Sequence, residues 1–282
     1  MFPTPIEKRS RNWQISYQVI LPFALILWLL PLIAVAMFSI KPAADFANGN
    51  YWGLPSSFEA ISNYGKVFFE SNMPRYLLNS MMITIPTVIG AVALSCMAGF
   101  ALGVYRFKGN LFIFFMFIAG NFVPFQILMV PVRDLTISLG MYDSIQGLVL
   151  FHIAFQTGFC TLFMRNFIRA LPYPLIEAAR VEGVAEWRIF WYVVLPLMKP
   201  ALAALAVLIF TFIWNDYFWA VVLTQGPSAQ PVTAGITEFN SQFRAAYHLM
   251  SAGSIVAALP PVAMFFLMQK HFIAGLTLGA VK

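Results

Sequence analysis

The sequence EAARVEGVAEWRIFWYVVLP, residues 177–196, is a polar interruption between the fourth and fifth long apolar stretches of the chain. Pro172 and Pro174 precede it, and proline is favoured where a helix begins because its ring presets φ for the first turn. Gly183 can take the left-handed conformation that ends a helix. We therefore predict a hairpin of two helices, at about residues 175–182 and 186–195, with Pro196 stopping the second.

The apolar stretches around this interruption indicate a membrane protein. Sixty per cent of the residues are hydrophobic and ten per cent are charged, whereas soluble domains carry about 25% charged residues. A helix that crosses a hydrocarbon core of about 30 Å needs about 20 apolar residues, and its backbone groups must be satisfied within the helix. We predict an all-α membrane protein, a single transmembrane domain over residues 1–282, with six helices at about 17–40, 77–105, 111–132, 144–165, 200–223 and 249–269.

Basic residues are distributed unequally between the two sets of loops that six membrane helices create. With the N-terminus inside, twelve Lys and Arg residues fall on the inner side and five on the outer side, which is the bias of cytoplasmic loops. Both termini and the loop 172–198 are therefore predicted to be cytoplasmic. Orientation explains the net charge of +6 without a nucleic-acid partner. The inner set is Lys8, Arg9, Arg11, Arg106, Lys108, Arg165, Arg169, Arg180, Arg188, Lys199, Lys270 and Lys282, and the outer set is Lys41, Lys66, Arg75, Arg133 and Arg244.

Polar residues within the fourth and fifth apolar stretches are candidates for a translocation path. Such groups are costly in a membrane and tend to face the bundle interior or a water-filled cavity. Hydrogen-bonding groups beside aromatic rings also suit a polar solute whose C–H faces stack on the rings. The same residues could instead hold helices together through hydrogen bonds, and the sequence leaves both interpretations open. The candidates are His152 and Gln156 on one face of the fourth helix, and Thr211, Trp214, Asn215 and Phe218 on one face of the fifth, with Asp216 adjacent.

A stripe of small residues runs along the predicted second helix. Small side chains allow the backbones of two membrane helices to approach closely. We therefore predict that this stripe packs against another helix of the bundle. It consists of Ser80, Thr84, Thr87, Ala91 and Ser95.

Motifs for nucleotide binding and for catalysis are missing from the sequence. It contains no G-x-x-x-x-G-K-[ST] phosphate loop, so we do not expect this chain to hold ATP itself. It also contains no H-E-x-x-H motif, and no Ser/His/Asp or paired-carboxylate arrangement is evident. We predict no catalytic residue, no metal site and no cofactor in this chain.

The spacing of the polar interruption resembles a known motif. Glu177-Ala178-Ala179, three residues, Gly183, nine residues, and then Val193-x-Leu195-Pro196 resembles the EAA loop of ATP-binding-cassette (ABC) importer permeases, which usually have Ile at the position of Val193 and often Asp at the position of Glu182. Along most of its length the chain is similar to the six-helix inner-membrane subunit of the maltose importer. Other segments that resemble carbohydrate-type permeases are Tyr51-Trp52-Gly53-Leu54-Pro55, Leu78-Asn79-Ser80, Phe212-Ile213-Trp214-Asn215 and residues 269–282.

The resemblance implies a type I ABC importer permease fold in the bacterial inner membrane. It implies four kinds of contact: a second permease subunit, two ATP-binding-cassette ATPase subunits that bind the ATP and Mg, a periplasmic substrate-binding protein, and the lipid membrane. A sugar or sugar derivative would then cross by alternating access. The segment Gln225–Gln242 lies where maltose-type permeases contact the binding protein, and Gly275–Lys282 where they contact the ATPases. The residues implied in ATPase coupling are Glu177, Ala178, Ala179, Arg180, Glu182, Gly183, Leu195 and Pro196.

Two functions of other classes fit the sequence less well than an ABC importer does. An ion-coupled secondary transporter acting without an ATPase calls for paired intramembrane acids or broken helices at repeat-related positions, whereas His152 and Asp216 stand isolated in the sequence. A membrane-embedded enzyme lacks a recognisable catalytic constellation. Among importers, glycerol phosphodiesters, polyols and modified sugars remain open as substrates.

Overall fold

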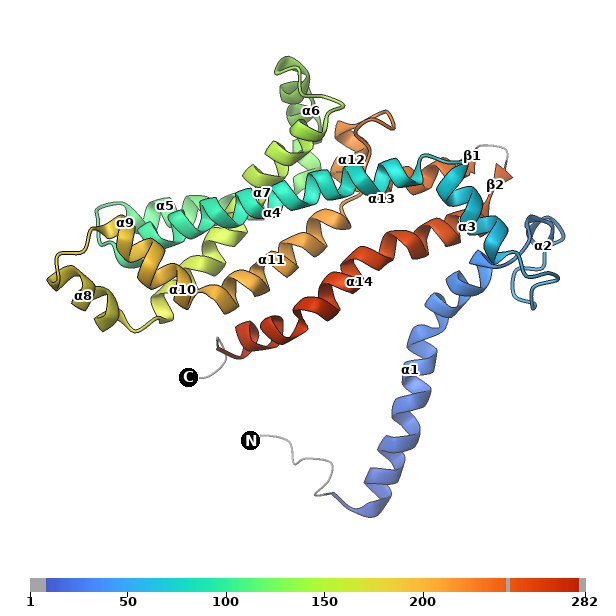
Figure 1. Ribbon diagram of the computed structural model, residues 1–282, viewed down its shortest axis with the longest axis horizontal. Coiled ribbons are helices and arrows are strands. Elements are labelled where there is room, and N and C mark those ends of the chain that lie inside the picture. Colours follow the sequence, from blue (N-terminus) through green and yellow to red (C-terminus); the bar gives the residue numbers. More distant parts are fainter. Residues whose placement is uncertain (1–8, 242–243, 279–282) are drawn as a thin grey trace. The chain divides into compact units, whose positions relative to one another are not determined.

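The computed structural model describes residues 9–241 and 244–278, with side chains described for residues 9–240 and 246–269 (Figure 1). The described residues fall into two compact units. The first contains the residues up to Ser71 together with Phe239–Val256, and the second contains Asn72–Glu238 together with the residues from Ala257 onward. The predicted ATPase contact at Gly275–Lys282 lies outside the residues whose side chains are described.

The first unit begins with a long apolar helix whose surface is open. It comprises α1 (Arg11–Ser39), α2 (Ala43–Ala47), α3 (Ala60–Phe69), the antiparallel pair β1 (Asn240–Ser241) and β2 (Arg244–Ala245), and the start of α14 (Tyr247–Leu278). None of the residues in the most apolar window of α1 is buried inside the chain. The end of α1 is fixed by Asn63 of α3, whose side-chain amide donates to the backbone carbonyls of Ser39 and Lys41, both at 2.9 Å.

The second unit is built around α4 (Met73–Val104), α7 (Ile145–Ala170) and α11 (Lys199–Trp214), with the closest packing between α4 and α7. At Gly99 the two backbones approach so closely that an added Cβ would lie 2.9 Å from Met164 Cβ. Gly103, one helical turn further on, also faces α7, as expected for small residues at a membrane helix interface.

The predicted packing stripe of α4 is confirmed. All of its members are buried, namely Ser80, Thr84, Thr87, Ala91 and Ser95. Two of them also make polar contacts. The Ser95 hydroxyl donates to the Thr157 carbonyl of α7 at 3.3 Å, and the Ser80 hydroxyl accepts from the Val232 backbone N–H at 2.8 Å.

The third predicted helix, at 111–132, is not a single straight helix. It divides into α5 (Asn110–Ala119), the short 3₁₀ turns η2 (Gly120–Phe122) and η3 (Phe125–Leu128), and α6 (Met129–Ser138), with an 87° bend. Pro124 explains the break, because proline disfavours helical geometry in the residue before it. Val123 is accordingly extended, at φ −74° and ψ 122°.

The fifth predicted helix, at 200–223, is also interrupted. The helix α11 ends at Trp214, and α12 (Phe218–Leu223) begins after a short break. Asp216 stabilises the break, because its carboxylate accepts from the Ala220 backbone N–H at 3.1 Å and so serves the first turn of α12. The chain continues through α13 (Val232–Gly235) and η5 (Ile236–Phe239).

Among the described residues, four helices are long and apolar enough to cross a membrane, and up to six spans are present if each of two bent pairs counts as one. The four are α1, α4, α7 and the Tyr247–Gln269 part of α14, which correspond to the first, second, fourth and sixth predicted spans. The bent pairs are α5–α6 and α9–α11. The predicted number of six spans is therefore reached only if each bent pair crosses the membrane as one span. The cytoplasmic placement of both termini stays a prediction.

Candidate functional site

The polar interruption forms the predicted hairpin, and its first helix is α8 (Tyr173–Val181). Pro172 directly precedes α8 and Pro174 lies in its first turn, where the missing N–H has no helical acceptor in any case. After α8 the chain reverses at Gly183, whose φ of +72° lies in the left-handed region. The expected use of glycine at this turn is confirmed, because a Cβ disfavours that conformation.

The second arm of the hairpin differs from the prediction that Pro196 stops it. It runs as α9 (Glu186–Ile189), a π-helical turn η4 (Phe190–Val194) and α10 (Leu195–Leu197), and so passes through Pro196. An interior proline removes one hydrogen bond and clashes with the carbonyl four residues earlier. Directly before Leu195, the wider π turn replaces the usual i→i+4 backbone hydrogen bonds of an α-helix with i→i+5 bonds. The arm then meets α11 at a 75° bend.

A cluster of polar side chains joins the two arms to each other and to the end of α4. Arg180 of α8 donates to both carboxylate oxygens of Glu186, from Nε at 2.6 Å and from Nη2 at 3.2 Å. The Tyr105 hydroxyl, directly after α4, donates to Glu186 Oε2 at 2.8 Å. A further Arg180 nitrogen, Nη1, donates to the Tyr173 hydroxyl at 3.2 Å. We call Tyr105, Tyr173, Arg180 and Glu186 the clasp.

The electrostatics of the clasp follow from these contacts. The Arg180 hydrogen bonds lower the pKa of Glu186 below its usual range, and the Tyr105 hydrogen bond acts in the same direction. The Glu186 carboxylate in turn raises the pKa of Arg180. Both side chains are therefore charged at neutral pH, and Arg180 contributes to the internal structure of the hairpin.

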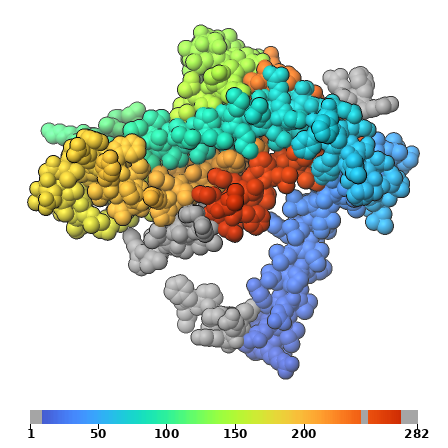
Figure 2. Space-filling view, viewed as in Figure 1, coloured from blue at the N-terminus to red at the C-terminus, as the bar shows by residue number. Residues whose placement is uncertain are grey.

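The end of the hairpin exposes apolar and acidic side chains together. Val181 is 87% exposed, and Glu177, Ala178 and Glu182 are exposed around it. On the opposite face of α8, Ile176 is only 2% exposed and packs into the core. In Figure 2 the yellow residues of this hairpin protrude at one end of the second unit. The exposed set is therefore available for contact with another molecule.

A second candidate site is a cavity of about 350 Å³ between α7 and the α11–α12 break. It brings together three of the predicted path residues, His152, Gln156 and Asp216. His152 Nε2 lies 3.7 Å from Asp216 Oδ2, so the two residues that stand apart in the sequence are neighbours in the fold. The remaining lining is aromatic apart from Asn121 and Ile213, and it comprises Phe125, Phe155, Phe159, Phe212 and Trp219.

The other four predicted path residues do not line this cavity. Trp214 is 2% exposed and donates from Nε1 to the Ala257 carbonyl at 3.0 Å. Thr211 bonds back to the Val207 carbonyl at 2.8 Å. The Asn215 amide donates to the Thr211 carbonyl at 2.9 Å. Phe218 lies beyond the helix break, so the single face predicted for residues 211–218 is not formed.

Sequence reasoning missed the clasp residues Tyr105, Tyr173 and Glu186. A signal for Glu186 was present, because Arg180 and Glu186 flank the predicted turn with opposite charges. Tyr105 carried no such signal, since its partner lies 81 residues away in the sequence. Sequence reasoning also missed Asn121, which reaches the cavity only because α5 ends beside α7.

A family model described as "Binding-protein-dependent transport system inner membrane component" matches residues 91–277, which include the hairpin and the cavity. The chain belongs to that family. The permease is therefore a multi-pass component of the inner membrane, and it is a transport subunit rather than an enzyme.

Relatives cover nearly the whole permease. It is 32% identical over 279 residues to the arabinooligosaccharides transport system permease protein AraQ of Halalkalibacterium halodurans, covering 98% of this chain and 99% of that protein. It is 29% identical over 283 residues to the osmoprotective compounds uptake permease protein GgtD of Synechocystis sp., covering 98% and 95%.

Solved structures show the same fold. One chain of a bacterial ABC transporter involved in the import of the acidic polysaccharide alginate matches with a TM-score of 0.81 and 25% identity, covering 95% of the permease and 100% of that chain. A bacterial alginate ABC transporter in complex with an alginate pentasaccharide-bound periplasmic protein matches with a TM-score of 0.68 and 17% identity, covering 92% and 93%. The permease therefore has the ABC importer permease fold.

Proposed function

We propose that the permease is one of two membrane subunits of an ATP-driven importer for a sugar or sugar derivative, and that α8 couples it to a partner ATPase. The observation that carries the coupling role is the exposed end of the hairpin. Ala178 and Val181 present apolar surface there, with Glu177 and Glu182 beside them. Apolar surface with a polar rim is typical of a docking site.

The internal contacts of the hairpin suit it to transmit a displacement. The clasp links α8 to α9 and to the end of α4. From α9 the chain remains helical to Leu197, and only Met198 separates it from α11. A movement imposed on α8 by a partner is therefore passed to two core helices rather than absorbed in a loose loop. In this proposal the ATPase subunits bind the ATP and Mg, and their closure moves the hairpin so that the membrane cavity alternates between its two sides.

The cavity at His152 and Gln156 supports a sugar as the transported molecule. Its volume of about 350 Å³ lies at the small end of ligand pockets, which span about 300–1,000 Å³. Amide, imidazole and carboxylate groups can bond sugar hydroxyls, while the aromatic rings stack on C–H faces. None of the described residues that line it is Lys or Arg, so an uncharged sugar fits this cavity better than a phosphorylated or acidic one.

The proposed partners follow from the family and the similar structures. A periplasmic binding protein would deliver the sugar, as the family description implies and as the alginate transporter complex illustrates. Residues 225–242 are proposed to face that protein. A second permease subunit would complete the path.

The coupling role is tested in the importer assembled with its ATPase and binding-protein partners. An added Cβ at Gly183 meets no atom within 4 Å, so its cost comes from the backbone φ of +72°. Gly183→Val should abolish coupled transport, because a β-branched residue is strongly disfavoured in that conformation. Gly183→Asn is the matched control and should retain transport, since asparagine tolerates the left-handed region.

Charge reversal at the exposed end gives a second arm of the experiment. Glu177→Lys should weaken retention of the ATPase subunits on the purified permease, whereas Glu70→Lys, a reversal at an exposed residue outside the hairpin, should not. Normal import and normal ATPase retention in both Gly183→Val and Glu177→Lys would show that the coupling role is wrong. Transport by the reconstituted permease without ATPase subunits would instead favour an ion-coupled secondary transporter.

A further inference from the structure

A cavity of about 760 Å³ lies where the loop between α4 and α5 meets the end of α7 and the start of α8. Among the described residues that line it, four are basic, Arg106, Lys108, Arg165 and Arg169, and none is acidic. It is separate from the cavity at His152 and from the exposed end of the hairpin. An unbalanced cluster of this kind attracts anions.

Arg165 is the buried member of the cluster. Its side chain is 7% exposed, and the guanidinium carbon lies 3.9 Å from the centre of the Phe114 ring. Its Nε donates to the Leu102 carbonyl at 3.1 Å, but within residues 9–240 and 246–269 no carboxylate lies within 4.0 Å of it. A guanidinium has five N–H donors in a fork that matches the oxygens of a phosphate. Arg165 therefore has no carboxylate partner within the described structure.

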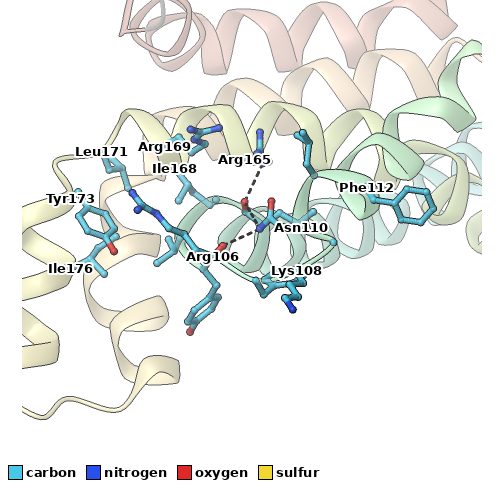
Figure 3. Close-up of a pocket in the computed structure, with 17 residues that line it drawn as sticks. Arg106, Lys108, Asn110, Phe112, Arg165, Ile168, Arg169, Leu171, Tyr173 and Ile176 are labelled. Atoms are coloured by element: carbon cyan, nitrogen blue, oxygen red, sulfur yellow. Dashed lines mark hydrogen bonds between the residues drawn. The ribbon is translucent and has the colours of Figure 1, made fainter.

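The two exposed arginines complete the cationic side of the cavity. Figure 3 shows the Arg165 and Arg169 side chains next to each other on α7, while Arg106 extends from the α4–α5 loop toward Tyr173. That loop is held in shape by Asn110, whose amide donates to the Leu102 and Tyr105 carbonyls at 3.1 and 2.9 Å. Helix α7 thus places Arg165 and Arg169, and a loop held by hydrogen bonds places Arg106.

The rim of the cavity is apolar. Phe107, Leu111 and Phe112 line it and are 43%, 56% and 68% exposed. Phe107 lies in the connection between the apolar helices α4 and α5, and Leu111 and Phe112 lie in the first turn of α5. Because a connection between two membrane helices is expected at the membrane surface, we infer that the cavity lies at the level of the lipid headgroups. A phosphate that carries acyl chains would satisfy the arginines and cover the apolar rim at once, which a free phosphate cannot do.

We propose that this cavity binds the phosphate of an anionic membrane phospholipid, with Arg165, Arg169 and Arg106 as its ligands. Basic pockets between membrane helices are known to hold such headgroups. Tyr173 and Ile176 of α8 also line the cavity. The bound headgroup therefore contacts the hairpin and braces it against the α4–α5 loop.

Lipid titration into the delipidated, full-length permease in detergent tests the site, with bound lipid counted by native mass spectrometry. The probes are phosphatidylglycerol, phosphatidylcholine and inorganic phosphate. Phosphatidylglycerol should bind, and the double variant Arg106→Gln/Arg169→Gln should bind it roughly 25-fold more weakly, at about fivefold for each cation removed. The control Arg133→Gln/Arg188→Gln removes the same charge from residues outside the cavity and should bind like the unaltered chain.

Hydrogen exchange at α8 gives a second readout of the same site. The backbone amides of residues 175–181 should exchange more slowly with phosphatidylglycerol than with phosphatidylcholine, and the double variant should lose the difference. This measurement needs neither transport nor ATP, so it can fail while the proposed import function stands.

Four results would overturn the proposal. If phosphatidylcholine bound as strongly as phosphatidylglycerol, the site would not recognise the charge of the headgroup. Equal loss of binding in the control variant would show general surface attraction. Competition by inorganic phosphate at the same concentration would assign the site to a soluble phosphate. Unchanged phosphatidylglycerol binding in the double variant would show that these arginines do not hold the lipid.

Discussion

The clasp makes a specific energetic prediction for the hairpin. Tyr105→Phe removes one hydroxyl, which donates to the partly exposed Glu186 carboxylate at 2.8 Å. Loss of a hydrogen bond of this kind costs about 1 kcal/mol. The Arg180–Glu186 pair is bidentate, but its side chains are 29% and 42% exposed, so solvent screening limits its contribution to about 0.5–1 kcal/mol. Glu186→Gln should therefore destabilise the hairpin by a similar amount.

The two changes should not be additive, because the hydroxyl of Tyr105 bonds the same carboxylate that Arg180 binds. A hydrogen bond to a charged acceptor is about twice as strong as a neutral one, so Tyr105→Phe should cost less once Glu186 is Gln. We expect a coupling free energy of about 0.5 kcal/mol from the double-mutant cycle. The sign of this coupling free energy should show that Tyr105 and Glu186 stabilise each other in the unaltered protein.

Amide hydrogen exchange of α8 in lipid nanodiscs measures this cycle. Tyr105→Phe should raise the opening equilibrium of α8 about fivefold. Tyr192→Phe is the matched control, since Tyr192 lies in the same hairpin, is 74% exposed and should leave exchange unchanged. A coupling free energy of zero within error would refute the reasoning, because it would mean that Tyr105 and Glu186 act independently.

Three further predictions concern pH, packing and transport. The melting-temperature difference between the unaltered permease and Glu186→Gln should be constant above the ordinary glutamate pKa of 4.5 and shrink as pH falls through the lowered value. The reason is that the hydrogen bonds that lower the pKa of Glu186 stabilise the folded protein only while this carboxylate is charged. A difference that grows on acidification would contradict the clasp. Gly99→Ala should destabilise the folded permease by about 1–3 kcal/mol in thermal unfolding, because the added Cβ would lie 2.9 Å from Met164 Cβ. The control Gly103→Ala, whose added Cβ has its nearest contact at 3.3 Å, should be close to neutral. Equal effects of the two changes would refute the close approach at Gly99. Gln156→Ala should reduce sugar transport about fivefold through loss of one hydrogen bond, and unaltered uptake would remove Gln156 from the path.

Much of the hairpin could be predicted from the sequence because its signals are local. Pro174 and Gly183 act through their own backbone preferences, and these hold in any context. The continuation of the second arm through Pro196 was predicted wrongly. The second arm contains a π turn that begins at Phe190. Phe190 packs against Phe100 of α4, with ring centres 5.2 Å apart, and this contact between distant parts of the chain cannot be predicted from the local sequence.

The candidate cavity shows the same division. Sequence placed Gln156 and His152 on one helical face, because a spacing of four residues fixes that relation in any α-helix. It did not place Asp216 beside His152, since that contact depends on the break after Trp214 and on how α7 and α11 pack. The break also separates Phe218 from the face to which it was assigned.

By itself the sequence determined that this chain is a helical membrane protein with a helical hairpin between its fourth and fifth apolar stretches. Hydrophobic length, charge asymmetry and residue-specific backbone preferences are local properties, so they are readable without coordinates. Only the tertiary structure decided which distant groups meet: Tyr105 with Glu186, His152 with Asp216, and the arginines of α7 with the α4–α5 loop. Such meetings depend on the packing of whole helices, which is a sum over many weak contacts that no single stretch of sequence contains.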